Sequence, residues 1–288
     1  MFKVQRPNFP GKKCKRQVKS IFYFSLLTLS LFTSNAMAQD TENYGAVWTE
    51  IGVTKVLPYN FSLEAGVGFR TLDWFEDANR FDASIGLSYK LGKYLKFGLG
   101  YTFIERHYWD RPKTHYNRYG IFNGYNIDES HWAQRHRVSF DVTADKRFWK
   151  TLRISLRERY QYTHQAARDF TRQRQRDPSF DADGNITGFD EITELPEHKA
   201  AWDRHLLRSR LKFAIDRKGL AWEPFTSVEF HNDIGNSWHL DKIRAMAGTE
   251  YAVSKQHKVS AAYVFTHEND DDGNENIHAI SIGYRFKF

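Results

Sequence analysis

The sequence predicts an all-β protein, an antiparallel transmembrane β-barrel of about 10–12 strands. Three observations predict this fold: eleven segments with period-two alternation, short turns that alternate with longer polar loops, and a final segment that ends on an aromatic residue. Strands with one apolar and one polar face are typical of barrels that face lipid outside and polar side chains inside. No segment with helical periodicity competes with these strands.

Residues 1–38 have the organisation of a secretory signal peptide. Seven basic residues and no acidic residue lie in this stretch, and the apolar run Ile21–Thr33 is followed by Ala36-Met37-Ala38. A basic region, an apolar region and a small-residue cleavage site occur in this order in exported proteins. The run is shorter than the roughly 20 apolar residues of a transmembrane helix. We expect cleavage after Ala38, with residues 39–288 forming one outer-membrane barrel.

Composition restricts the chemistry of the remaining chain. The chain has 42 Lys and Arg residues and 35 Asp and Glu residues. Seven of the basic residues lie in residues 1–38, so the rest of the chain has equal numbers of basic and acidic residues. The predicted barrel is therefore formally neutral, which argues against a nucleic-acid partner. The single cysteine, Cys14, lies within the predicted signal, so disulfides, thiol catalysis and cysteine-bound metals are excluded for the mature chain.

The predicted strands follow one another along the whole mature chain. The first is expected at 44–57, and strict alternation then covers 61–70, 81–91 and 95–103. In 61–70, for example, the apolar Phe61, Leu63 and Val67 alternate with the small or polar Ser62 and Glu64. Period two over about ten residues indicates a strand with two different faces. Further strands are expected at 134–149, 152–164, 202–217, 221–231, 242–254, 257–268 and 276–288.

The connections between these strands alternate in length. Short turns such as Gly92-Lys93-Tyr94 alternate with longer polar loops, of which the longest are at about 110–131 and 171–198. Transmembrane barrels have this asymmetry, with short periplasmic turns and long extracellular loops. The sequence shows no linker and no second domain.

Aromatic residues mark the ends of the predicted strands. They predict two girdles at the membrane interfaces, although buried aromatic corners of a soluble β-protein would give a similar pattern. Only Trp48 among the tryptophans falls outside this scheme. Trp149, Trp222, Tyr59 and Tyr94 flank short turns, and Trp74, Trp109, Trp132, Trp202 and Trp238 flank longer loops.

The final strand predicts both membrane assembly and a problem of topology. Ile280, Ile282, Tyr284, Phe286 and Phe288 form an apolar face that ends at the C-terminus, as in the assembly signal of bacterial outer-membrane barrels. Counting back from a periplasmic C-terminus makes the first of eleven strands begin outside, whereas bacterial single-chain barrels normally have even counts. Either one predicted strand is wrong, or a short strand is hidden, or the first and last strands pair in parallel.

Residue 84 is not part of the predicted assembly signal. The residue at position 84 is a serine, and Ser84 lies on the polar face of the segment 81–91, between Ala83 and Ile85. We therefore expect residue 84 to have no role in assembly.

Five segments resemble a known family. They are Tyr44–Trp48, Arg135–Arg137, Arg153–Tyr162, Leu207–Leu211 and Tyr284–Phe288. Together they resemble the outer-membrane barrel family catalogued as domain of unknown function 2490, over nearly all of the mature chain. This resemblance implies a barrel, but it implies no activity and no site residues.

Strand parity places a set of charged residues on the inward face. A charged Arg or Lys at the midplane of the lipid-facing surface costs about 2–4 kcal/mol, so these side chains are expected in the lumen. They could form a cationic ladder for anionic solutes or a structural network of Arg–carboxylate pairs. The expected basic residues are Arg135, Arg137, Arg153, Arg157, Arg159, Arg204, Arg208, Arg210 and Lys212. The expected acids are Glu64, Asp82, Asp141, Glu223, Glu229 and Glu250.

One acid has the wrong parity for the lumen. Glu158 falls on the outward face between Leu156 and Tyr160, so we expect a bulge there or a position near the outer interface.

Other motifs give weaker hypotheses. The loop residues His231, Asp233, Ser237, His239 and Asp241 could serve a hydrolase at the rim, but spacing alone does not establish a triad. The segments 181–185 and 270–274 look like fragments of calcium loops without the full ligand series. The basic run 168–176 could contact lipopolysaccharide phosphates, or it could be an ordinary solvated loop.

The sequence thus favours a bacterial outer-membrane barrel with a structural or binding role, without catalysis and without a cofactor. A small anionic-solute channel and a rim hydrolase are the alternatives. The expected partners are outer-membrane lipid, lipopolysaccharide, and the barrel-assembly machinery through the C-terminal strand.

The signal-peptide prediction can be tested directly. We expect the membrane-bound protein to begin at Gln39, because the small-x-small tripeptide ends at Ala38. N-terminal sequencing of the mature protein measures this, and a membrane-bound chain that still begins at Met1 would contradict it.

Overall fold

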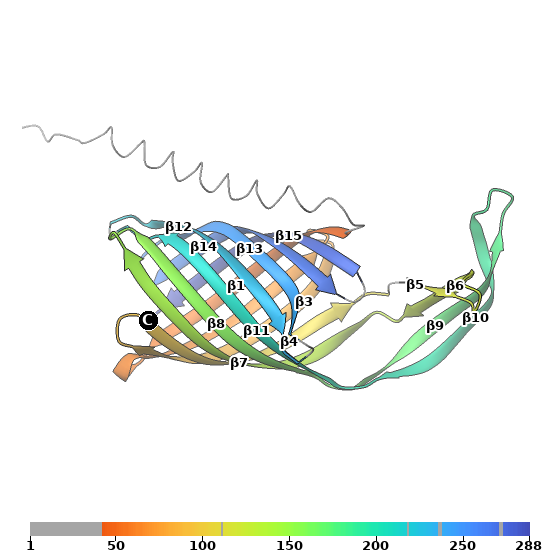
Figure 1. Cartoon of the computed structure of the whole chain (residues 1–288), viewed down its shortest axis with the longest axis horizontal. Helices are drawn as coiled ribbons and strands as arrows, with labels where there is room; N and C mark the ends of the chain where they lie inside the picture. The colour runs from red at the N-terminus through yellow and green to blue at the C-terminus, as the bar shows by residue number, and fades with distance from the viewer. Residues whose placement is uncertain (1–41, 111, 218, 236–237, 271–272) are drawn as a thin grey trace, which may run out of the picture.

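The structure is a computed structural model that describes residues 42–110, 112–217, 219–235, 238–270 and 273–288. The predicted signal peptide and its cleavage site lie outside these residues. A closed barrel of eleven strands makes up most of the described chain, and a separate four-stranded sheet projects from one end of it (Figure 1). The predicted all-β barrel of 10–12 strands is confirmed.

The barrel strands correspond one to one with the predicted segments. Around the barrel they are arranged in the order β1-β15-β14-β13-β12-β11-β8-β7-β4-β3-β2. Their bounds are β1 Glu42–Val56, β2 Phe61–Leu72, β3 Asp77–Leu91, β4 Leu95–Tyr108, β7 His131–Phe148, β8 Leu152–Gln165, β11 Trp202–Ile215, β12 Trp222–Asp233, β13 His239–Ala252, β14 His257–Asp270 and β15 Gly273–Lys287.

A parallel seam closes the barrel. β1 pairs in parallel with β15, from Glu42 opposite Glu275 to Thr54 opposite Lys287, whereas the other barrel pairs of the described chain are antiparallel. Of the three explanations for an odd strand number, parallel pairing of the first and last strands is therefore the correct one. The backbone of Phe288 extends the seam, since its N–H donates to Thr54 and its carbonyl accepts from Val56.

Position 84 lies on β3, which β1 and β2 separate from the terminal strand β15. It is a serine and not a tyrosine: Ser84 is in the middle of β3, opposite Gly66 of β2. Its hydroxyl donates to the carbonyl of Gly66 at 3.3 Å. In the described hydrogen bonds, the side chain of Ser84 contacts only the neighbouring strand β2.

The two ends of the barrel differ. Short turns join the strands at the end where the chain terminates, and one of them is the 3₁₀ turn Pro58–Asn60. We call this the turn end. Both excursions to the additional sheet leave from the opposite end, which we call the projecting end (Figure 1). β1 therefore begins at the projecting end and runs toward the turn end.

The additional sheet, which we call the projecting sheet, lies where the sequence predicts only polar loops. The stretches expected as the longest polar loops form the strands β5 Pro112–Tyr116, β6 Phe122–Asp128, β9 Arg168–Phe180 and β10 Ile186–Lys199, in the order β10-β9-β6-β5. The basic run 168–176 is therefore a strand and not a loop. Alternation gave no signal because polar side chains occupy both faces of β9, with Arg172 and Arg174 on one face and Gln173 and Gln175 on the other.

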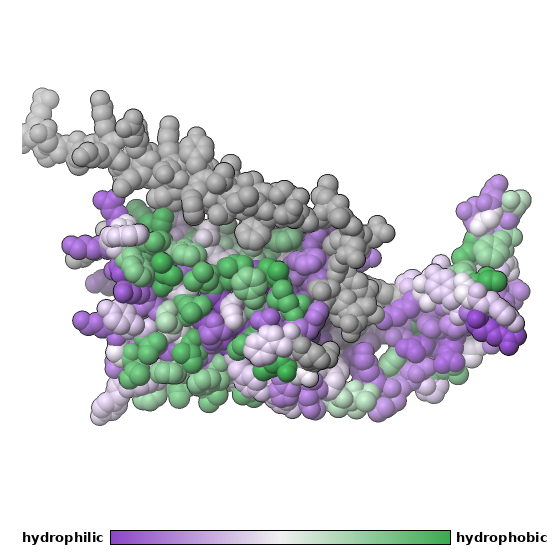
Figure 2. All heavy atoms as spheres, in the orientation of Figure 1, coloured by the Kyte–Doolittle hydropathy of each residue, from purple (hydrophilic) through white to green (hydrophobic). Residues whose placement is uncertain are grey.

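The outward face of the barrel is apolar and exposed. Ile51, Val67, Ile85 and Leu99 lie on four neighbouring strands and are 53–58% exposed. Figure 2 shows hydrophobic residues over much of the visible barrel wall, whereas hydrophilic residues predominate on the projecting sheet. A contiguous apolar surface of this kind marks an interaction with lipid or protein.

Most of the predicted aromatic residues project at the two ends, but Trp202 differs. Trp149 at the turn end is 83% exposed, and Trp238 at the projecting end is 65% exposed. Trp202 does not belong to an outer girdle, because its ring packs against the guanidinium of Arg135. Trp48, which fitted no girdle, contacts arginines inside the barrel.

A small apolar cluster lies inside the barrel next to the seam. Ala46, Val264 and Ala279 are fully buried, and Trp48 and Met246 pack against them. The cluster joins β1, β15, β14 and β13, so apolar burial supports the one pairing that is parallel. Among the residues that the structure describes, no helix has the length and apolar character needed to cross a membrane.

Trp74 secures the start of β1 from outside. Its backbone N–H donates to the carbonyl of Gly45, and a Cβ at Gly45 would lie 2.5 Å from the Trp74 indole. The hydroxyl of Thr71 in the same corner accepts the N–H of Val47 at 3.0 Å. This packing requires glycine at position 45.

We therefore predict that Gly45→Ala lowers the free energy of unfolding by about 1–3 kcal/mol, because an overpacked site must shift. The thermal midpoint of the folded barrel, followed by its gel mobility, measures this effect. Gly45→Ala combined with Trp74→Ala should recover part of the Gly45→Ala loss. Gly52→Ala is the control, since a Cβ there would have ordinary contacts at 3.7 Å. Equal midpoints for the two single glycine variants would contradict the prediction.

Candidate functional site

The candidate site is the inward face of the barrel, where charged side chains from nearly every strand come together. Six of the nine predicted basic residues have a carboxylate within 4.0 Å. These pairs are Arg153 with Asp145 and Glu223, Arg157 with Glu229, Arg159 with Asp141, Arg204 with Asp233 and Asp241, Arg208 with Glu229, and Lys212 with Glu250.

All six predicted acids have a cationic neighbour. Glu64 accepts from Lys96 at 2.7 Å, Asp82 lies 3.0 Å from Arg80, and Glu250 accepts from Lys212 and Lys258. Glu223 lies 3.5 Å from Arg153 and 3.7 Å from Lys258. The remaining two, Asp141 and Glu229, accept hydrogen bonds from arginines. The acids therefore act as acceptors within an ion-pair network.

Glu229 is the centre of that network. Its side chain is only 5% exposed, and its carboxylate accepts from Arg157 at 3.0 Å and from Arg208. Arg244 lies 3.9 Å away, and Nε2 of His231 lies 2.8 Å from the same carboxylate. The cations come from β8, β11 and β13, and His231 lies on β12 with Glu229 itself, so one carboxylate links four strands. Because a buried carboxylate is costly without partners, Glu229 depends on these contacts as much as they depend on it.

Two further pairs have the geometry that arginine favours. Arg159 binds Asp141 through two parallel hydrogen bonds, which is the bidentate arrangement of a guanidinium with a carboxylate. Arg204 on β11 bridges Asp233 on β12 and Asp241 on β13. Both arrangements fix neighbouring strands relative to one another from the inside.

Three of the predicted basic residues have no carboxylate within 4.0 Å in the described part of the chain: Arg135, Arg137 and Arg210. Neutral groups hold two of them. Arg135 donates from Nε to Gln165 at 2.7 Å and packs against the ring of Trp202, and Arg137 donates to Thr163 at 3.0 Å. Hydrogen bonds of this kind orient a guanidinium without neutralising its charge.

Further charged residues of the inward face were absent from the sequence-based set. Arg70, Arg80 and Arg106 occupy directly opposite positions on β2, β3 and β4. Lys242 pairs with Glu268 at 2.5 Å. Arg70 was visible on the polar parity of its segment, but Arg80 and Arg106 lay beyond the predicted ends of their strands. The alternating pattern does not show that β3 and β4 continue as far as these two residues at the projecting end.

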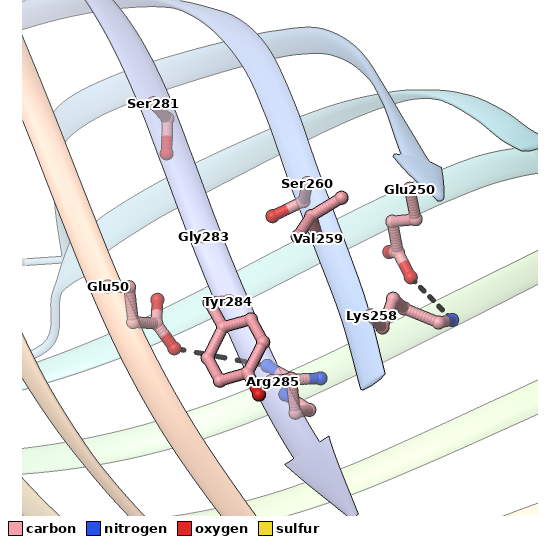
Figure 3. A pocket seen from close by; sticks show the side chains of 9 residues that line it. All are labelled: Glu50, Glu250, Lys258, Val259, Ser260, Ser281, Gly283, Tyr284 and Arg285. Carbon is pink, nitrogen blue, oxygen red and sulfur yellow. Dashed lines mark hydrogen bonds and ion pairs between the residues drawn. The ribbon is translucent and has the colours of Figure 1, made fainter. Parts of the chain in front are cut away.

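A pocket opens into the lumen at the turn end. Figure 3 shows Glu250 directed toward Lys258 and Glu50 toward Arg285, from strands on both sides of the seam. Lys258 lies 2.8 Å from Glu250, and Arg285 lies 3.9 Å from Glu50. The Glu50–Arg285 pair is well exposed, so it contributes little to stability. The charges of this pocket balance one another.

The residues considered for a rim hydrolase are engaged elsewhere or lie outside the described chain. Asp233 and Asp241 accept from Arg204, and His231 contacts Glu229. His239 is exposed on β13, and Ser237 lies outside the described residues.

The possible calcium fragment at 181–185 is a turn. Asp181 accepts the backbone N–H groups of Asn185 and Asp183, and these hydrogen bonds lower the pKa of its carboxyl. This is an Asx turn at the tip of the β9–β10 hairpin. The described residues contain no group of three or more His, Cys, Asp or Glu side chains suited to a metal. Part of the second fragment, 271–272, lies outside them.

Glu158 lies on β8, and the basic run 168–176 lies on β9. Both pairings of β8 continue past Glu158 without a register shift, so the expected bulge is wrong. Its carboxylate stays on the outward face in the middle of β8 and accepts the hydroxyl of Ser209 at 2.6 Å. In the projecting sheet, Arg172 binds Asp128 and Arg174 binds Glu197, so these two arginines are already paired.

Comparison with known proteins identifies one family. A family model described as a protein of unknown function (DUF2490) matches residues 45–277. No curated protein and no solved structure matches the chain.

The network leads to a prediction about Glu229. We expect Glu229→Gln to lower the free energy of unfolding by about 3–5 kcal/mol, because the change leaves buried guanidinium groups without their carboxylate. Glu64→Gln is the matched control, since its pair with Lys96 is about half exposed and such pairs contribute about 0–1 kcal/mol. The loss of the folded form on heating measures both variants. Equal midpoints would show that Glu229 is not the centre of the network.

Proposed function

The chain belongs to the family of proteins of unknown function DUF2490, and we propose that it is an outer-membrane β-barrel that acts as a non-catalytic structural or binding protein. One observation carries the proposal: the closed barrel has an exposed apolar outer face and an inner face linked by ion pairs. This arrangement, apolar outside and charged inside, is the reverse of that in a water-soluble protein. It has a low free energy when lipid surrounds the barrel.

The two ends of the barrel support an orientation across the outer membrane. The short turns and Phe288 lie together at the turn end, which would face the periplasm. The projecting sheet would then lie outside the cell, where its polar side chains would contact the polar groups of lipopolysaccharide. The signal-like residues 1–38 support export, and the aromatic C-terminal strand supports insertion by the barrel-assembly machinery.

The inner face favours a binding or structural barrel over an open pore. Arg157 on β8 reaches Glu229 on β12, and Trp48 on β1 packs 4.8 Å from the guanidinium of Arg244 on β13. These contacts join strands that are not neighbours, so the side chains reach over one or two intervening strands into the lumen. A network of this kind rigidifies a narrow barrel.

A small anionic-solute channel is the second candidate. It is favoured by the inward arginines that lack a carboxylate among the described residues, since rings of basic side chains select anions. Conductance of the purified protein in a planar bilayer separates the two candidates. A structural or binding barrel gives no steady ionic current, whereas a channel gives an anion-selective current that Arg137→Gln weakens.

The C-terminal strand provides the test of the proposed function. Deleting Phe288 removes two backbone hydrogen bonds to β1 and the terminal aromatic ring. We expect the deleted protein to be lost from the outer-membrane fraction and degraded in the periplasm, as measured by fractionation and by the heat-dependent gel shift. Phe180→Ala, which removes an exposed ring from the projecting sheet, is the control and should assemble normally. Normal amounts of the deleted protein in the outer membrane would overturn the proposal.

A further inference from the structure

The charges of the inner face are distributed unevenly along the barrel axis. Near the turn end, cations and carboxylates alternate: Lys96 binds Glu64, and Lys258 binds Glu250. Toward the projecting end, arginines accumulate without a matching number of acids among the described residues. The proposed function does not explain this arginine-rich region, because a structural network needs acids and bases in comparable numbers.

Three arginines form the first part of this region. Arg70, Arg80 and Arg106 face one another directly on β2, β3 and β4. Like charges in directly opposite positions of a sheet are destabilising. Of the three, only Arg80 has a carboxylate within 4.0 Å in the described chain, Asp82 at 3.0 Å. The guanidinium of Arg70 instead packs on the indole of Trp48 at 4.4 Å, whose ring also contacts Arg244.

Two more arginines extend the region onto the next strand. Arg137 lies opposite Thr102 of β4, and Arg135 lies opposite Ile104, which have the same parity as Arg106 and therefore share its inward face. Arg70 and Arg208 lie close enough to Arg137 to repel it, with Asp82 as the one acid that attracts it, and Arg106 repels Arg135. The guanidinium groups of β2, β3, β4 and β7 therefore converge on one volume of the lumen.

The contacts of these arginines orient them without neutralising them. Gln165 and the hydroxyl of Tyr108 hold Arg135, and Thr163 holds Arg137. The rings of Trp48 and Tyr108 lie against Arg70 and Arg106. Half-buried cations held in place beside one another lose solvation and repel. The nearby Glu229 shows that this chain places a carboxylate among arginines where pairing stabilises the barrel.

We propose that Arg70, Arg106, Arg135 and Arg137 form a binding site in the lumen for a multivalent oxyanion of the phosphate type. The planar donors of a guanidinium match two oxygens of a phosphate, and several guanidinium groups can share a tetrahedral anion with more than two oxygens. A monocarboxylate has only two acceptor oxygens and one charge, so it would satisfy fewer of these donors. The inference rests on the proposed function in one respect, since it assumes a barrel whose lumen can be reached by solutes.

Inorganic phosphate is the probe for this site. The purified full chain, folded in detergent, is titrated with phosphate and with chloride at equal ionic strength, and binding is followed by calorimetry and by the thermal midpoint. We expect phosphate to bind and to raise the midpoint, whereas chloride does neither. Arg137→Gln should weaken phosphate binding by about tenfold, because a charge-assisted hydrogen bond is lost. Arg285→Gln is the control at the turn end and should bind phosphate normally.

The sign of the stability change adds a second test. Without phosphate, Arg137→Gln should melt at or above the temperature of the unchanged protein, because it removes repulsion and breaks no ion pair of the described chain. A marked loss of stability in the absence of phosphate would indicate a structural role for Arg137 and would overturn the inference. Equal effects of phosphate and chloride, or equal loss of binding in Arg285→Gln, would overturn it as well.

A final comparison distinguishes a free solute from a lipid headgroup. The same titration is repeated with a soluble sugar phosphate and with micelles that contain a phosphate-bearing lipid. Binding of inorganic phosphate and the sugar phosphate supports a solute site in the lumen. Binding of the lipid alone would overturn it. A folded, membrane-inserted barrel that ignores phosphate overturns this inference and leaves the proposed function standing, whereas failure to insert overturns the proposed function.

Discussion

The inner face of the barrel depends on one carboxylate, Glu229. A strand turns every second side chain inward, so a barrel with an apolar exterior collects its charged residues in a confined space. In that space an unpaired charge is costly, and a single acid that accepts from Arg157 and Arg208 offsets the cost for several cations at once. Because these cations come from different strands, the network also determines how the strands are placed relative to one another. The pair of Lys96 with Glu64 at the turn end is about half exposed, so it contributes less to stability than the contacts of Glu229.

The parallel seam is the second constraint on the architecture. An odd strand number forces the first and last strands to run in the same direction, and parallel pairing is slightly less stable per residue than antiparallel pairing. Two features offset this. The apolar cluster of Ala46, Val264 and Ala279 packs against the seam from inside, and Trp74 covers the start of β1 from outside. The backbone of Phe288 then continues the hydrogen bonding to the last residue of the chain.

The sequence predicts the barrel well and its ends poorly, for a physical reason. Alternation is visible only where the two faces of a strand meet different environments, so all eleven barrel strands were found but several were drawn too short at the projecting end. Arg80 and Arg106 were missed for this reason. β9 and β10 were missed because both of their faces are polar. The same parity argument identified Glu229 and its partner Arg157, but it could not show which of the inward residues touch, since contacts between strands that are not neighbours depend on the curvature of the closed barrel. The position of Trp202 shows the same limit, because residues at a strand end can point either way.

Charge balance in the whole chain hides a local imbalance. After residues 1–38, the numbers of acidic and basic residues are equal, and a composition argument would leave no cation without a partner. The acids are unevenly placed, however. Some lie in the projecting sheet, where Asp128 and Glu197 bind arginines of β9, and others lie in the balanced region at the turn end. The inward arginines of β2, β4 and β7 are therefore left with hydroxyl, amide and aromatic neighbours. These neighbours are the kind that hold a guanidinium in one orientation while leaving its charge available. Buried guanidinium groups need negative charge within reach. Around Glu229 the chain's own carboxylate supplies it, and beside Arg70 a bound anion supplies it.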